Sequence, residues 1–97
     1  VGNVLRYGWP EHWIRTLNRH IIKLHIKEFS RGFMNSKGLR EGFNVELLEG
    51  DNNWPMVMKA VREINHQGGW LTAELPGGDK NYLKKISRQM DQIIEYF

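Results

Sequence analysis

The 97-residue chain contains no cysteine, which excludes a disulfide framework and any thiolate site for catalysis or metal binding. No apolar run approaches the roughly 20 residues that a membrane-spanning helix needs. The 14 Lys and Arg residues exceed the 11 Asp and Glu residues only enough for a formal charge of +3, and they form no basic run. We therefore expect no membrane and no nucleic-acid partner, and the lack of cysteine favours a cytoplasmic location.

The chain also lacks an initiator methionine and a visible signal peptide, since it begins at Val1. An export signal ahead of Val1 is thus left open. The length is enough for one small domain if all of its elements close around a single core.

Two short stretches alternate apolar and polar residues, a pattern typical of β-strands with one buried face. In IIKLHIKEFSR, residues 21–31, isoleucine and leucine alternate with lysine and histidine. In GWLTAEL, residues 69–75, the leucines share one face and Glu74 lies on the other. His25 and Glu74 thus each lie near the C-terminal end of a strand, on its polar side.

Apolar stripes and helix-start signals predict three helices. The first begins at Trp9-Pro10 and ends near Arg19, the second is capped by Asn53 and stops at residues 66–69, and the last follows a cap at Asp79 or Asn81. Residues 29–53 form a long connection with four glycines, which is either a solvated loop or a functional lid.

The expected order is therefore helix, strand, helix, strand, helix, and the strand–helix–strand unit predicts parallel strands joined by a right-handed crossover. A two-stranded parallel sheet of this kind has two open edges and one uncovered face. We infer that residues 1–97 are a single partial domain of the α/β class, the C-terminal portion of a (β/α)8 TIM barrel whose earlier strands are missing.

Four short motifs, in chain order, resemble those of the sugar phosphate isomerase/epimerase family of xylose-isomerase-like TIM barrels. They are Val1-Gly2-Asn3, His25-Ile26-Lys27-Glu28, Leu48-Glu49-Gly50 with Trp54-Pro55, and Glu74. An aspartate of the family's first motif would stand immediately before Val1, and Leu48 and Glu28 replace a common Gly and a common Asp. The resemblance covers nearly the whole chain.

The resemblance implies a divalent metal, in most cases Mn²⁺ with Mg²⁺, Co²⁺ or Zn²⁺ as alternatives, held by two glutamates, an aspartate and a histidine. Of these ligands, His25 and Glu74 are present in the chain. Glu74 is also implied to be catalytic, moving a proton at the carbon next to a carbonyl through an enediolate. Arg31, Lys27 and Asn3 are implied to contact the substrate, a sugar or a sugar phosphate.

We therefore expect the full-length parent to be a metal-dependent sugar or sugar-phosphate isomerase or epimerase, and this chain alone to be inactive. Alternatives are a hydroxypyruvate isomerase, an inosose dehydratase, an endonuclease, or a non-catalytic homologue of the same barrel. A homo-oligomeric parent is also left open. Without the resemblance, a lone strand histidine such as His25 is more often structural, whereas Glu74 opposes the β-propensity of its neighbours, as functional residues often do.

Overall fold

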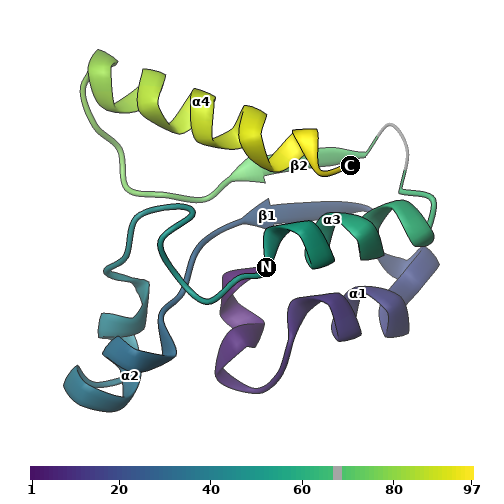
Figure 1. Cartoon of the computed structure of the whole chain (residues 1–97), viewed down its shortest axis with the longest axis horizontal. Helices are drawn as coiled ribbons and strands as arrows, with labels where there is room; N and C mark the ends of the chain where they lie inside the picture. The colour runs from purple at the N-terminus through teal and green to yellow at the C-terminus, as the bar shows by residue number, and fades with distance from the viewer. Residues whose placement is uncertain (67–68) are drawn as a thin grey trace.

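The computed structural model describes residues 1–66 and 69–97 (Figure 1). The described elements, in chain order, are the 3-10 turn η1 (Gly2–Arg6), α1 (Pro10–Leu17), η2 (Asn18–His20), β1 (Lys23–Ile26), α2 (Arg31–Lys37), η3 (Leu39–Phe43), α3 (Trp54–Glu63), β2 (Trp70–Ala73) and α4 (Lys80–Glu95).

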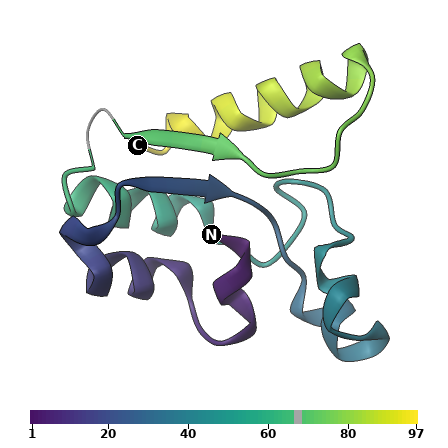
Figure 2. The ribbon, with the colours of Figure 1, turned by 180° about the vertical axis from the view of Figure 1, so that it is seen from behind.

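The two strands pair in parallel, as the crossover prediction requires. The register places Lys23 beside Trp70 and His25 beside Thr72. Helix α3 lies in the connection between the strands and packs against α1, and α4 follows β2 and contacts α3 (Figure 1). Figure 2 looks onto the opposite face of the sheet, which these helices leave uncovered.

The core lies between the sheet and the helices. From β1 it takes Leu24 and Ile26, and from α3 it takes Val57, Ala60 and Val61, all buried. These are the positions that the period of two and the helical spacing predict, because each element must bury its apolar side. Burial of a valine, leucine or isoleucine side chain stabilises a fold by roughly 1.5–3 kcal/mol.

Local signals explain where the helices start. The Asn53 side chain accepts a hydrogen bond from the Met56 N–H at 3.2 Å, and Asp79 rather than Asn81 caps α4 by accepting from the Tyr82 N–H at 2.8 Å. The helix predicted to stop at residues 66–69 ends at Glu63, and Gln67 and Gly68 of that predicted stop lie outside the described residues.

The prediction of a TIM-barrel portion is wrong. Over the residues that the structure describes, the chain is a small α/β fold with four α-helices and a single two-stranded parallel sheet, without the repeated strand–helix alternation of a barrel. A barrel closes because every strand pairs on both edges, whereas in residues 1–66 and 69–97 β1 and β2 pair only with each other.

The predicted element order is also wrong, because residues 29–53 are not a bare loop. Helix α2 and the turn η3 lie in this segment, so two helices separate the strands. The Ser30 hydroxyl accepts a hydrogen bond from the Phe33 N–H at 3.2 Å and caps α2. Among the helices of residues 1–66 and 69–97, none has the length and apolar character that crossing a membrane requires.

Candidate functional site

Three polar side chains meet at the C-terminal ends of the two strands. His25 Nδ1 lies 3.4 Å from Glu74 Oε2, and Lys27 Nζ lies 3.6 Å from Glu74 Oε1. The parallel register produces this meeting, because the Glu74 N–H donates to the Ile26 carbonyl oxygen at 2.9 Å and so extends the pairing by one residue. We call His25, Lys27 and Glu74 the strand-end cluster.

The cluster is open to solvent on its His25 side. The side chains of His25 and Glu74 are 48% and 47% exposed, whereas that of Lys27 is 26% exposed. The Lys27 ammonium also lies 4.6 Å from the centroid of the Phe43 ring, a cation–π distance. Because water screens charges at this exposure, the ion pairs contribute less than about 1 kcal/mol to stability.

The backbone nitrogen of Val1 lies next to β1. It donates a hydrogen bond to the His25 carbonyl oxygen at 2.7 Å.

The donor atoms of the cluster match a divalent metal in type but not in number. An imidazole nitrogen and a carboxylate suit Mn²⁺ or Zn²⁺. A protein site for such an ion usually supplies three or four ligands, and residues 1–66 and 69–97 contain no group of three or more His, Asp or Glu placed to hold one. An ion bound by His25 and Glu74 would thus need further ligands from water, from a substrate or from other protein segments.

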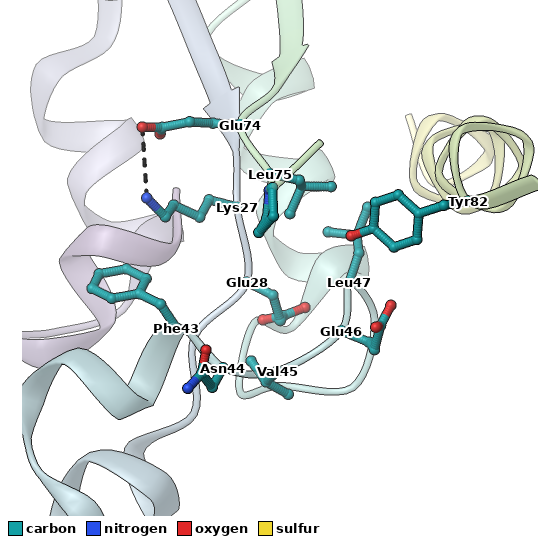
Figure 3. Close-up of a pocket in the computed structure, with 11 residues that line it drawn as sticks. Lys27, Glu28, Phe43, Asn44, Val45, Glu46, Leu47, Glu74, Leu75 and Tyr82 are labelled. Carbon is teal, nitrogen blue, oxygen red and sulfur yellow. Dashed lines mark ion pairs between the residues drawn. The ribbon is translucent and has the colours of Figure 1, made fainter. Parts of the chain in front are cut away.

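A pocket of ≈ 630 Å³ adjoins the cluster at the same end of the sheet (Figure 3). Lys27 and Glu74 form one side of it, and Tyr82 of α4 lies across from them. We call it the strand-end pocket. Its lining residues are Lys27, Glu28, Phe43, Asn44, Val45, Glu46, Leu47, Glu74, Leu75, Pro76 and Tyr82.

Glu28, next to Lys27 in the chain, has a structural role. It is 2% exposed, and its two carboxylate oxygens accept five hydrogen bonds. The donors are Phe29 N at 3.2 Å, Leu48 N at 3.1 Å, Asn52 N at 3.1 Å, Asn52 Nδ2 at 2.7 Å and Trp54 Nε1 at 2.9 Å. Glu28, a buried acid of the second motif (residues 25–28), therefore binds the third motif (residues 48–50 and 54–55) through hydrogen bonds.

Gly50 belongs to the same structural unit. A Cβ atom added there would lie 2.5 Å from Glu28 Cγ and 2.5 Å from the Phe29 carbonyl oxygen, so only glycine fits. The third motif, Leu48-Glu49-Gly50 with Trp54-Pro55, thus holds residues 48–54 against the end of β1. Packing and hydrogen bonding within the fold explain its glycine and its tryptophan, and no ligand is needed to explain them.

Arg31 lies apart from the cluster. Its Nε donates to the Leu5 carbonyl oxygen at 2.6 Å, its terminal nitrogen donates to Gly8 at 3.0 Å, and its guanidinium lies 4.1 Å from the centroid of the Trp9 ring. In the described structure no hydrogen bond or ion pair joins it to Glu74. Arg31 thus fastens η1 to the start of α2, and Asn3 is exposed in η1.

The pocket residues that sequence reasoning missed come from the long connection and from the start of α4. Phe43, Asn44 and Glu46 lie in the connection, which its length alone marks as a lid or a solvated loop. Tyr82 lies in the first turn of α4, three residues after the cap, and its helical position gave no sign of a site.

Comparison of the chain with protein-family models, with curated proteins and with solved structures finds no match.

Proposed function

We propose that this chain contributes the strand-end cluster to the active site of a sugar isomerase or epimerase that uses a divalent metal. The observation that carries the proposal is the placement of one carboxylate, Glu74, between His25 and Lys27 at the edge of a pocket large enough for a sugar. The resemblance of four motifs to a family of such enzymes supports it.

In this proposal Glu74 is the general base. Its carboxylate takes a proton from the carbon next to the substrate carbonyl, the electron pair of that C–H bond moves toward the carbonyl oxygen, and the proton returns to a neighbouring carbon or to the opposite face. The Lys27 ammonium, which lines the same pocket, offsets the negative charge that develops on the substrate oxygen.

His25 and Glu74 would hold the metal, which when bound supplies Lewis-acid polarisation of the substrate carbonyl. His25 can serve this role because its side chain is half exposed and its Nδ1 faces the Glu74 carboxylate. Since the described residues supply two ligands, we expect the chain alone to bind metal weakly and to be inactive without the groups that complete the site.

Metal binding by the chain itself tests the proposal. Mn²⁺ added to the ¹⁵N-labelled chain should broaden the amide signals of His25 and Glu74 first, because a paramagnetic ion broadens nearby nuclei most. His25→Asn and Glu74→Gln should each weaken this broadening by about tenfold, the scale on which a disturbed metal site loses affinity.

His20→Asn is the matched control, since His20 is an exposed histidine outside the cluster and its loss should leave the Mn²⁺ response unchanged. Broadening that persists in both cluster variants would refute the assignment of ligands. In any longer protein that contains this chain, Glu74→Gln should also abolish incorporation of solvent deuterium into a ketose.

A non-catalytic sugar-binding protein is the second candidate, and the shortage of metal ligands in residues 1–66 and 69–97 favours it. The two candidates differ in their dependence on metal. A binding protein should hold a sugar equally well with and without Mn²⁺, whereas the enzyme site should hold it more tightly when Mn²⁺ is present.

A further inference from the structure

The strand-end pocket has the dimensions of a site for one small polar molecule. Its volume of ≈ 630 Å³ lies within the range of roughly 300–1,000 Å³ that small-molecule sites occupy. Phe43, Val45 and Leu75 give it apolar walls, and polar side chains stand between them (Figure 3). A ligand that fits must therefore present both apolar faces and polar groups.

Negative charge exceeds positive charge in the lining. Glu28, Glu46 and Glu74 bring three carboxylates, whereas the described residues of the lining include a single cation, Lys27. Lys27 is already paired with Glu74, and the nearby Lys85 donates to Glu46 at 2.9 Å. A phosphate group carries about −1.5 to −2 charges at pH 7 and binds where uncommitted cations converge. The strand-end pocket offers no such arrangement.

The start of α4 is the other feature near the pocket that could attract an anion, because helix N-termini carry partial positive charge. Asp79 occupies this position: its carboxylate accepts a hydrogen bond from the Tyr82 N–H at 2.8 Å. The helix end is thus already matched with a negative charge, which disfavours a phosphate there.

Hydroxyl groups suit the lining better than charged groups do. The carboxylates of Glu46 and Glu74 accept hydrogen bonds, the Lys27 ammonium donates them, and the Tyr82 hydroxyl does both. Each hydroxyl of a sugar is both donor and acceptor, and the C–H faces of the ring can pack on Leu75.

From this charge balance we infer that the strand-end pocket accepts a sugar without a phosphate group and discriminates against the phosphorylated form. The inference rests on the proposed function and narrows its substrate class to uncharged polyhydroxy carbonyl compounds. Glu46 acts in it as a specificity residue: its carboxylate repels an anion, and its pairing keeps Lys85 from binding one.

The test is an NMR titration of the ¹⁵N-labelled chain with D-fructose, D-fructose 6-phosphate and inorganic phosphate at constant ionic strength. D-Fructose should shift the amide signals of Lys27, Asn44 and Tyr82. D-Fructose 6-phosphate should bind the same pocket at least about tenfold more weakly, because like charges disfavour it. Inorganic phosphate should leave the pocket signals unchanged.

Glu46→Gln removes one carboxylate and frees Lys85, while it keeps the shape of the side chain. This variant should lower the preference for D-fructose over D-fructose 6-phosphate several-fold, because it removes a charge that repels the phosphate and frees a cation that attracts it. Glu49→Gln is the matched control, because Glu49 is exposed, lies in the same connection and is outside the pocket lining.

The outcomes separate this inference from the proposed function. If D-fructose 6-phosphate binds the pocket as tightly as D-fructose, or if phosphate shifts the signals at the start of α4, the inference is wrong while a sugar site remains. If neither sugar shifts the pocket signals, the inference and the proposed function fail together.

Discussion

Glu28 and Glu74 are two carboxylates at neighbouring strand ends, and their surroundings differ in every respect. Glu28 is 2% exposed and accepts five hydrogen bonds, from backbone, amide and indole donors. Glu74 is 47% exposed and its side chain faces two cationic or basic groups. A buried acid whose oxygens are all occupied holds a fold together, whereas an open acid with weak contacts is available to a ligand.

Replacement of the buried acid should have the largest effect. Glu28→Gln puts an amide N–H₂ where N–H donors converge, so at least two hydrogen bonds are lost and donors face each other. We expect the free energy of unfolding to fall by about 3 kcal/mol, measured by urea denaturation with an unchanged slope. A loss no larger than that of the exposed control Glu49→Gln would contradict the structural role.

Removal of one donor to Glu28 should have an intermediate effect. Trp54→Phe deletes the indole N–H, which lies 2.9 Å from Glu28 Oε2, and keeps a ring in the core. We expect a loss of about 1–2 kcal/mol in the same urea measurement. The double variant with Glu28→Gln tests whether the two side chains are energetically coupled. Its free energy of unfolding should fall by less than the sum of the decreases in the two single variants.

Replacement of the open acid should change stability least among the three. Glu74→Gln removes the charged partner of His25 and Lys27. Exposed ion pairs contribute less than about 1 kcal/mol to stability, so the free energy of unfolding should change by no more than that. The same variant should lose Mn²⁺ and sugar binding. A large destabilisation by Glu74→Gln would mean that Glu74, like Glu28, is structural.

A third acid, Glu63, whose side chain is 41% exposed, extends the comparison to pH. Its hydrogen bond from Arg15 at 2.6 Å lowers the pKa of Glu63 below its usual value of 4.5. Stability from this pair is therefore present above pH 4.5 and is lost as pH falls through the lowered pKa. The small difference in melting temperature between the wild type and Glu63→Gln at pH 7 should vanish at pH 2; a difference that persists would contradict the assignment.

The sequence predicted the strands and their parallel pairing because alternation is a local signal, and the meeting of His25 with Glu74 follows from that pairing. Helix α2 was missed because Gly32 and Gly38 flank a stretch without a helical apolar period. The barrel was inferred from the open edges of the sheet and from the resemblance of four short motifs to a barrel family, and the structure contradicts it.

The roles of Glu28 and Arg31 could not be predicted from sequence, because their partners are distant along the chain. Four of the five donors to Glu28 lie 20 to 26 residues away, and Arg31 binds carbonyls 23 and 26 residues before it. Local patterns carry no information on such pairs. The motif that contains Glu28 predicted a site, whereas in the structure it contains both His25, which belongs to the open strand-end cluster, and Glu28, which is buried in the fold.

The five hydrogen bonds to Glu28 also affect the affinity that the pocket would have for a ligand. They order the connection after β1, whose residues 43–47 form one wall of the pocket, before any molecule arrives. A loop that must become ordered on binding loses conformational entropy, at about 1–2 kcal/mol for each residue fixed. Here the loop is already ordered in the folded chain, so binding of a sugar would not require that loss of entropy. More of the free energy of the sugar's contacts would therefore contribute to its affinity.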